Sequence, residues 1–441
     1  MGLNQTPASE RLHIGFFGKQ NAGKSSVINA VTGQDLAVVS SQKGTTTDPV
    51  YKSMELLPLG PVVMMDTPGI DDTGDLGQLR VKKSYQVLNK TDGAVLVIDG
   101  EEGFSREDLS LLKRIREKRI PCVVAFNKAD QVSREKQRIQ EERFFAETAG
   151  HGREEGEDNP GKNASEKNAS EKNANAKADG EGLLWISAAT GAGIHELKEL
   201  LARFIQKDEE SRRIVGDLVS PLDFVVLVVP IDKAAPKGRL ILPQQQTIRD
   251  LLESGAGVMV VRETELKETL AHLGKRPSLV ITDSQVFGLV SALTPQEIPL
   301  TSFSILFARY KGNLKMAVKG AAALNRLKDG DRILISEGCT HHRQCGDIGS
   351  VKLPRWIRQH TGKDFAFEFT SGTEFPEDLR PYGLIVHCGG CMLNEREMKY
   401  RLSCAGAQEV PMTNYGILIA YLNGILKRSV QMFPDVYEML D

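Results

Sequence analysis

A glycine-rich segment close to the N-terminus has the spacing of a phosphate-binding loop. Gly18, Gly23, Lys24 and Ser25 fit the pattern G-x4-G-K-[ST], and the segment follows a short apolar run and opens a helix-like stretch. In such loops the backbone N–H groups face the phosphates, the lysine reaches the β- and γ-phosphates, and the serine holds Mg²⁺. The residues predicted to bind the nucleotide here are Gly18, Asn21, Ala22, Gly23, Lys24, Ser25 and Ser26.

A second motif, Asp66-Thr-Pro-Gly69, ends a strand-like run at residues 62–66. An aspartate in this place can hold Mg²⁺ through a water molecule, and the Gly69 N–H can sense the γ-phosphate. Lys24, Asp66 and Gly69 are therefore predicted to act in hydrolysis of the nucleotide. The next residue is Ile70, so the glutamine that orients the attacking water in Ras-like enzymes is missing, and the water must be positioned in another way.

Two later motifs predict that the base of the nucleotide is guanine. Asn127-Lys128-Ala-Asp130 ends an apolar strand-like run, and the Asp130 carboxylate can accept hydrogen bonds from guanine N1 and N2, which adenine cannot donate. Ser187 and Ala188 follow the next strand-like run and could contact guanine O6 through backbone N–H groups. The joint occurrence of these motifs with the phosphate loop predicts a site for GTP rather than ATP.

A different chemistry is indicated by cysteine and histidine residues in the last quarter of the chain. Cys339-Thr-His341 and His387-Cys388-Gly-Gly-Cys391 each follow a strand-like run. The carboxyl ends of parallel strands lie at one edge of a sheet, so the two motifs can converge there. Three thiolates and an imidazole are ligands for tetrahedral zinc and for a cubane iron–sulfur cluster alike. Cys345 is favoured as an incidental loop thiol, with a role as an additional ligand left open.

The elements that must position these motifs alternate between strand-like and helix-like stretches along most of the chain. Such alternation predicts βαβ units around mainly parallel sheets. In the second half it includes a strand predicted at residues 302–307 and one long helix predicted at 414–433. The predicted fold is α/β: an N-terminal P-loop GTPase domain followed by two smaller α/β domains with mainly parallel sheets.

Domain boundaries are predicted where the alternation is interrupted. We expect a GTPase domain at residues 1–210, a middle α/β domain at 218–310 and a third domain, which carries the cysteine and histidine motifs, at 311–441. Residues 150–182 contain no Val, Ile, Leu, Met or aromatic residue and carry a near-repeat of Lys-Asn-Ala-Ser-Glu. Such a segment cannot bury enough apolar surface to offset the entropy of ordering, so it is predicted to be a disordered insertion.

The composition and charge of the chain argue against several classes of protein. Lys and Arg number 56 and Asp and Glu 58, a net charge of −2, which gives no reason to expect a partner held by bulk positive charge such as a nucleic acid. No apolar run approaches the roughly 20 residues that span a bilayer. The N-terminus has no signal-peptide pattern, and the six cysteines are too few for a disulfide scaffold. A reducing, cytoplasmic location without membrane contact is therefore expected.

The nucleotide motifs together resemble the Era/TrmE group of GTPases. Gly44-Thr-Thr46-Thr-Asp48 is similar to the switch I motif of that group, and the resemblance implies that Thr46 is a Mg²⁺ ligand and acts in hydrolysis. Asn21 matches the position that helps to bind K⁺ in potassium-stimulated members of the group. A monovalent cation there could serve as the counter-charge of the transition state in place of an arginine finger. The resemblance thus implies a K⁺-stimulated GTPase.

The whole combination resembles the HydF family, the GTPases that mature [FeFe]-hydrogenase. The resemblance rests on the GTPase motifs, a middle α/β block and the C-x-H…H-C-x-x-C pattern, and it excludes residues 150–182. It implies a homodimer formed through the middle domain, and a [4Fe-4S] cluster on Cys339, Cys388 and Cys391. His341 and His387 are then candidates for the fourth ligand. The family also implies a scaffold or carrier for a transient diiron precursor, with radical-SAM maturases and apo-hydrogenase as partners.

A second function class competes with this one. Relatives of the Era/TrmE group commonly serve RNA, so the chain could instead be a regulatory GTPase of tRNA or ribosome biology with a structural zinc site. Against that interpretation, the C-terminal block has no basic stretch with interleaved aromatic residues. The absorption spectrum and metal content of anaerobically purified protein would discriminate between iron–sulfur and zinc.

Overall fold

The computed structural model describes residues 7–33, 49–70, 74–149, 181–205, 213–231, 240–338, 347–372, 374–390 and 393–440. The chain divides into two compact units, Met1–Asp208 and Glu209–Asp441. The division of the second unit into two separate domains stays a prediction. Some of the predicted site residues lie outside the described residues, namely Thr46, Cys339, His341, Cys345 and Cys391.

The first unit is built on a six-stranded sheet of order β2-β3-β1-β4-β5-β6. Neighbouring strands are parallel except β2, which runs antiparallel to β3 at one edge. The central strands are apolar and buried on both sides, as expected for a parallel sheet covered by helices. The strands are β1 (Leu12–Phe17), β2 (Val50–Leu56), β3 (Gly60–Asp66), β4 (Gly93–Asp99), β5 (Cys122–Asn127) and β6 (Glu181–Trp185).

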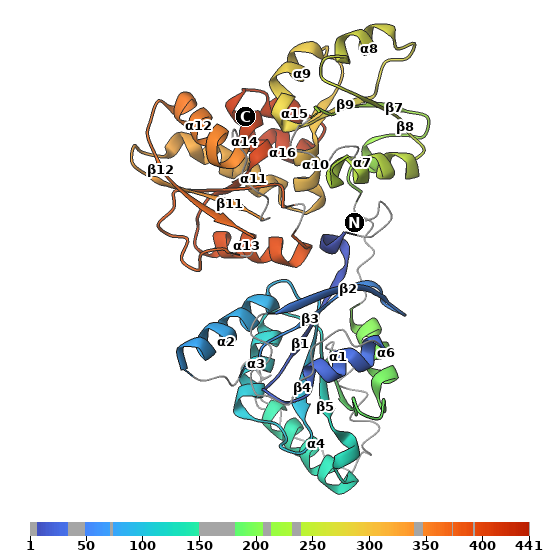
Figure 1. Cartoon of the computed structure of the whole chain (residues 1–441). Coiled ribbons are helices and arrows are strands. Elements are labelled where there is room, and N and C mark those ends of the chain that lie inside the picture. The colour runs from blue at the N-terminus through green and yellow to red at the C-terminus, as the bar shows by residue number, and fades with distance from the viewer. Residues whose placement is uncertain are drawn as a thin grey trace, which may run out of the picture. The chain divides into compact units, whose positions relative to one another are not determined.

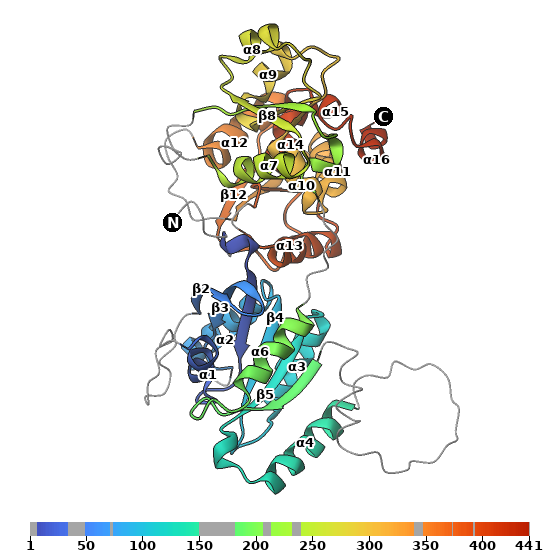
Figure 2. The ribbon, with the colours of Figure 1, turned by 90° about the vertical axis from the view of Figure 1, so that its right-hand side faces the viewer.

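Helices cover both faces of this sheet and build two separate apolar cores (Figure 1). One face carries α1 and α6, and the other carries α2, α3 and α4; Figure 2 looks onto the face that α6 covers. The helices are α1 (Lys24–Thr32), α2 (Gly74–Leu88), α3 (Arg106–Glu117), α4 (Arg134–Ala149) and α6 (Ile194–Phe204), with short 3-10 turns η1 (Ala8–Glu10) and η2 (Ala129–Gln131). Because β6 begins at Glu181, the predicted insertion reaches two residues into a strand.

The second unit contains two four-stranded sheets, of order β10-β9-β7-β8 and β12-β11-β13-β14. All of their strand pairs are parallel, which confirms the predicted α/β class. The first sheet consists of β7 (Phe224–Val228), β8 (Gly257–Val261), β9 (Leu279–Thr282) and β10 (Leu300–Ser302). The second consists of β11 (Arg332–Glu337), β12 (Ala366–Ser371), β13 (Leu384–His387) and β14 (Met412–Asn414).

One continuous apolar core joins the two sheets of the second unit. It combines side chains of β7 and β9 with side chains of β11 and β13, and α10, α11 and α14 contribute to it as well. The helices are α7 (Leu242–Glu253), α8 (Leu266–His272), α9 (Phe287–Leu293), α10 (Phe303–Tyr310), α11 (Leu314–Ala322), α12 (Leu353–Thr361), α13 (Glu395–Ala407), α14 (Tyr415–Leu422), α15 (Leu426–Ser429) and α16 (Pro434–Tyr437). Shorter turns are η3 (Gly216–Leu218), η4 (Ser284–Val286), η5 (Ala323–Arg326), η6 (Ile348–Lys352) and η7 (Glu438–Leu440).

Two predicted elements of this unit were wrong. The run predicted as a strand at 302–307 is the start of α10, where the Ser302 hydroxyl accepts a hydrogen bond from the Ile305 N–H and caps the helix. A short run buried on all sides shows no periodicity that separates helix from strand. The helix predicted at 414–433 is divided into α14 and α15, because the Gly424 backbone lies in the left-handed region between them.

Arg428, on α15, is hydrogen-bonded to the C-terminal end of α9. The Arg428 guanidinium donates to the Ser291 carbonyl at 2.9 Å, to the Thr294 carbonyl at 2.9 Å and to the Pro295 carbonyl at 2.7 Å. These carbonyls lie at and just after the C-terminal end of α9, where intrahelical donors run out. Arg428 on α15 therefore satisfies them and fixes α15 to α9.

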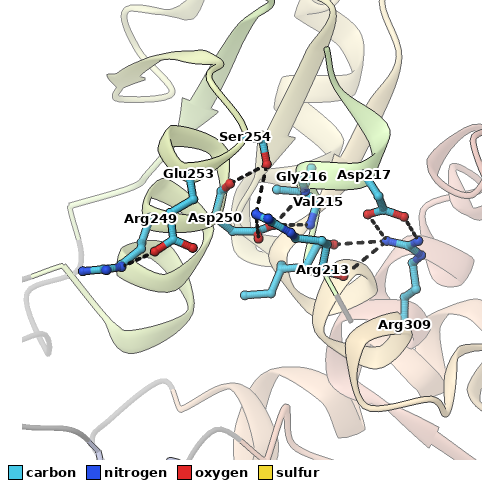
Figure 3. Close-up of polar contacts among 10 residues, drawn as sticks. Arg213, Val215, Gly216, Asp217, Arg249, Asp250, Glu253, Ser254 and Arg309 are labelled. Carbon is cyan, nitrogen blue, oxygen red and sulfur yellow. Dashed lines mark hydrogen bonds and ion pairs between the residues drawn. The ribbon is translucent and has the colours of Figure 1, made fainter. Parts of the chain in front are cut away.

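The chain enters the second unit through a polar network (Figure 3). One carboxylate oxygen of Asp250, on α7, accepts hydrogen bonds from the Val215 and Gly216 N–H groups at 2.8 and 2.7 Å. Asp217 forms an ion pair with Arg309 of α10. Asp250 thus fixes the backbone at Val215 and Gly216, and Arg309 holds the turn that follows at Asp217.

Within the described residues, no helix combines the length and apolar character needed to cross a lipid bilayer.

Candidate nucleotide and cluster sites

The predicted phosphate loop links the end of β1 to the start of α1. Gly18 and Gly23 both have positive φ angles, 143° and 89°. A Cβ atom at Gly18 would collide with the Val97 carbonyl, and one at Gly23 would collide with the Asn127 side chain. Glycine is therefore required at both positions for conformation and for space. The loop presents the N-terminus of α1, which favours an anion.

Lys24, Ser25 and Asp66 lie together beside this loop. The Lys24 ammonium donates to the Gly18 and Lys19 carbonyls at 3.0 and 2.7 Å. The Ser25 hydroxyl donates to Asp66 Oδ2 at 2.6 Å. Burial raises the pKa of Asp66, and Ser25 and Lys24 act in the opposite direction. The second carboxylate oxygen, Asp66 Oδ1, is buried without a hydrogen-bond partner, which is the kind of group that a cation compensates.

The base-recognition motifs meet at the neighbouring strand ends. Asn127, at the end of β5, donates through Nδ2 to the Ala22 carbonyl at 3.0 Å and accepts through Oδ1 from the Ala188 N–H at 3.1 Å. It thereby links the phosphate loop to the loop after β6. A hydrogen bond with Ser187 lowers the pKa of Asp130, so this exposed carboxylate stays ionised and able to accept hydrogen bonds. The structure thus brings together the residues predicted to read guanine.

One residue of this site was not predicted from the sequence. Asp99, at the end of β4, accepts a hydrogen bond from the Lys128 ammonium at 2.6 Å. The Lys128 backbone is in the left-handed region, with φ of 64°, and its side chain is anchored toward β4. Asp99 could have been identified from the sequence, because it is a carboxylate at the end of an otherwise apolar strand.

The second candidate site lies at the carboxyl ends of β11 and β13. These strands are adjacent, with Ser336 opposite His387. The Cys388 thiol follows β13 and accepts hydrogen bonds from the Gly338 N–H at 3.0 Å and the Gly390 N–H at 3.4 Å. Such donors favour a thiolate. Gly338 immediately precedes Cys339 in the sequence, so the two predicted cysteine motifs start from adjoining backbone.

His387 is almost fully buried and has a partner at each ring nitrogen. Nδ1 lies 2.7 Å from the Cys388 carbonyl oxygen, and Nε2 lies 3.0 Å from Arg401 Nη1. Burial, followed by the positive charge of Arg401, lowers the pKa of His387 to about 3. The imidazole is therefore neutral at physiological pH. Arg401, on α13, was not predicted as part of this site.

A small cavity of about 20 Å³ lies beside Cys388 and is lined in part by Lys311, Asn313 and Thr413. The Lys311 ammonium donates to the Gly390 carbonyl at 2.6 Å, and so holds the turn after Cys388. Asn313 Oδ1 and Thr413 Oγ1 are buried without a hydrogen-bond partner. The volume and the unpartnered oxygens suit an ordered water molecule.

The described residues hold only part of the predicted ligand set. Among them, no group of three or more His, Cys, Asp or Glu side chains is placed to hold a metal ion. Cys388 and His387 are described, whereas Cys339, His341 and Cys391 lie outside the described residues. Cys404, on α13, packs against the apolar cluster on the outer face of the second sheet.

Comparison with protein-family models gives three successive matches along the chain. A model described as a 50S ribosome-binding GTPase matches residues 13–128. The hydrogen maturase F dimerization domain matches residues 214–312, and the hydrogen maturase F tetramerization domain matches residues 315–432. The second unit is therefore covered almost entirely by two domains specific to hydrogen maturase F, which indicate a homo-oligomer.

Single relatives match part of the chain. The tRNA modification GTPase MnmE of Chromobacterium violaceum is 36% identical over 122 residues, which is 27% of each chain. MnmE of Laribacter hongkongensis is 28% identical over 46% of this chain and 36% of its own length. The chain thus spans about a third or less of the length of these relatives. The structure of Era from Aquifex aeolicus bound to GDP and AlF4⁻ is 18% identical and covers 59% of this chain and 98% of its own, with a TM-score of 0.35.

The order of these domains matches the two sites described above. A P-loop GTPase domain with the Gly18–Ser25 loop comes first, and the two domains specific to hydrogen maturase F follow it. Cys388 lies within the second of them. The chain therefore belongs to the HydF family.

Proposed function

We propose that this chain hydrolyses GTP in its first unit and holds a [4Fe-4S] cluster in its second, on which it assembles or delivers the diiron precursor of the [FeFe]-hydrogenase active site. The observation that carries the proposal is the environment of Cys388. Its sulfur accepts two backbone N–H bonds at the carboxyl edge of a parallel sheet, next to the residue that precedes Cys339. Radical-SAM maturases and apo-hydrogenase are the proposed partners.

In the first unit, Lys24 is proposed to neutralise charge on the β- and γ-phosphates, and Gly69 to contact the γ-phosphate. Ser25 and Thr46 would bind Mg²⁺ directly and Asp66 through water. The Ser25–Asp66 hydrogen bond of 2.6 Å and the unpartnered Asp66 Oδ1 support this assignment, because a nearby cation would complete the coordination of both oxygens. Ser26 is proposed to contact the nucleotide from the first turn of α1.

Asn21 is the proposed K⁺ ligand. It lies at the exposed turn of the phosphate loop with a positive φ of 59°, a conformation that asparagine tolerates better than most residues. A cation held there would lie beside the phosphates and offset charge in the transition state. Hydrolysis should be faster in KCl than in NaCl at equal ionic strength, and equal rates would contradict this assignment.

In the second unit, Cys339, Cys388 and Cys391 are the proposed cluster ligands, with His341 and His387 as the candidates considered for the fourth position. The donor set fits the group, since thiolates are the usual ligands of cubane clusters and Cys388 already receives backbone N–H bonds. When bound, the cluster would supply a one-electron redox centre with an iron to which the diiron cargo can attach. Lys311 and the Gly338 N–H keep the Cys388 turn in place.

The homodimer is proposed to form through the first sheet of the second unit. β8 is an outermost strand of that sheet. Its sequence Gly-Val-Met-Val-Val is apolar, yet Val260 is 44% exposed and the other residues are only half-buried. An apolar edge strand left open in this way favours pairing with a second copy. Val260→Lys should weaken the dimer in sedimentation experiments, whereas the exposed Val351, replaced in the same way on η6, provides the control.

The cluster proposal is tested by iron, sulfide and zinc analysis of protein reconstituted without oxygen, together with electron paramagnetic resonance of the reduced state. We expect about four irons and four sulfides per chain and the signal of a reduced cubane. Stoichiometric zinc with no iron in the wild-type chain would contradict the scaffold function and favour an RNA-linked GTPase with a structural zinc site.

A further inference from the structure

A fully buried arginine on α13 holds the histidine next to Cys388. Arg401 has no exposed surface, and its Nη1 lies 3.0 Å from His387 Nε2. We propose that His387 is a positioning residue for Cys388, locked in place by Arg401, and is not a ligand of iron. This inference rests on the cluster site proposed above.

The hydrogen bonds of His387 leave its ring only one arrangement of protons. A guanidinium has donors but no acceptor, so Nε2 must offer its lone pair to Arg401. The Cys388 carbonyl has acceptors but no donor, so Nδ1 must carry the proton that it receives at 2.7 Å. An imidazole binds a metal through a ring lone pair. The only lone pair of this ring is already used by Arg401.

Arg401 cannot easily move away from the His387 Nε2 lone pair. Its guanidinium also donates to Glu397 Oε1 at 3.0 Å, to Ser336 Oγ at 3.3 Å and to the Gly372 carbonyl at 2.7 Å. These groups belong to α13, to β11 and to the turn after β12. Moving the guanidinium would leave a buried charge without its partners, which is strongly unfavourable. The network therefore fixes the ends of three strands and the imidazole together.

The same network explains how His387 acts on the thiol. Its Nδ1–H holds the carbonyl of Cys388, while the Gly338 and Gly390 N–H groups hold the sulfur of the same residue. Backbone and side chain of Cys388 are thus restrained at two points. The sulfur is kept on the side of Gly338, where the chain continues to Cys339.

The experiment combines isotope labelling with substitutions of His387, Arg401 and His341. Chains labelled with [¹⁵N]histidine and unlabelled chains are reconstituted, reduced and compared by pulsed electron paramagnetic resonance. His387→Asn keeps a donor close to the Cys388 carbonyl, His387→Leu removes it, and Arg401→Lys keeps the charge but loses the planar fork. Arg396→Lys on the same helix is the matched control.

We expect His387→Asn to leave any histidine nitrogen coupling of the wild-type cluster unchanged. Arg401→Lys and His387→Leu should change the g values and release iron to a chelator roughly 10-fold faster, the usual scale for groups that orient a ligand. Arg396→Lys should resemble the wild type. A labelled wild-type chain without nitrogen coupling excludes histidine ligation whatever the variants do. A coupling that is lost in His341→Asn is assigned to His341, so the test does not depend on the folding of His387→Asn alone.

Two results would overturn the inference while leaving the cluster proposal intact: a nitrogen coupling that is present in the wild type and lost in His387→Asn, or an Arg401→Lys chain that matches Arg396→Lys in g values and iron release. A wild-type chain that takes up no iron would contradict the cluster proposal itself, and the inference with it.

Discussion

The nucleotide site and the Cys388 site lie in the same place on their sheets, at the carboxyl ends of parallel strands, but they are built in different ways. In the first, the contiguous loop Gly18–Ser25 supplies most of the groups that face an anion. In the second, the sulfur of Cys388 receives its N–H bonds from two separate segments, at Gly338 and Gly390. A third segment, through Arg401, orients the neighbouring imidazole.

This difference decides how each site depends on the rest of its unit. The phosphate loop itself needs one strand and one helix to be in place, and the residues that read the base are added from the ends of β5 and β6. A site gathered from three segments needs β11, β13 and α13 to pack correctly before any ligand binds. The predictions below test that difference and the independence of the two sites.

The largest expected effect is loss of iron on replacing Cys388. Cys388→Ala removes one of three proposed thiolate anchors, so the reconstituted chain should retain little or no cluster. GTP hydrolysis should be unchanged, because its residues lie in the first unit. Cys404→Ala, a thiol that packs in an apolar cluster, is the matched control and should keep its iron. Full iron loading of Cys388→Ala would remove this thiolate from the assignment.

The reciprocal change is Lys24→Ala. It removes the cation proposed to meet the β- and γ-phosphates, so GTP hydrolysis should fall by about 100-fold or more, the scale for loss of one group that stabilises transition-state charge. Iron content and the resonance signal should stay at wild-type levels. A cluster that is lost together with hydrolysis would mean that the two sites are not independent.

Asp130→Asn should change specificity rather than remove binding. The variant loses a charged acceptor for guanine N1 and N2, so GTP affinity should fall roughly 10- to 100-fold. Affinity for xanthosine triphosphate should rise, because its N2 position is a carbonyl that the new amide can meet with a donor. Calorimetric titration with both nucleotides measures the switch, and unchanged GTP affinity would contradict the base assignment.

Acid should weaken the first unit through His13, in the strand that leads into the phosphate loop. Burial lowers the pKa of His13 to about 4, compared with 6.5 in the unfolded chain. The stability contribution of the neutral form is therefore complete above pH 6.5 and is lost progressively as the pH falls to about 4. The loss is on the order of 3 kcal/mol.

Thermal unfolding between pH 7 and pH 4 measures this effect. His13→Gln should flatten the pH dependence of the first unit, whereas His195→Gln, at an exposed position of the same unit, should leave it in place. An unchanged slope in His13→Gln would rule out this histidine as the cause.

The smallest effect is expected from shortening the segment between α4 and β6. Its residues 150–180 lie outside the described residues. Replacing residues 152–178 with a short Gly/Ser bridge should change the melting temperature and hydrolysis little, since loop closure costs only about 0.6 kcal/mol per doubling of length. A large fall in melting temperature would show that the segment packs on the unit.

Sequence reasoning predicted the α/β fold and the order of the domains because strand-like and helix-like stretches alternate along the chain. It predicted the phosphate loop because the glycines and the lysine must keep a fixed spacing to surround the phosphates. It could not predict Arg401, because a lone arginine in a helix of mixed charge has the same pattern whether it faces solvent or a buried imidazole. α10 was missed for a related reason: a short apolar run carries no period once it is buried on all sides. Asp99 and Lys311 also act through contacts that only the fold creates.

The continuous core between the two sheets of the second unit has a mechanical consequence. Since that core and the Arg428 contacts join the region of β7–β10 to the region of β11–β14, the two regions form one packed arm, and we expect them to move together. In a homo-oligomer built on such arms, the spacing between the Cys388 sites of different copies is fixed by the symmetry of the contact. The distance that cargo crosses between copies would then be constant, and it would not depend on the length of a flexible linker.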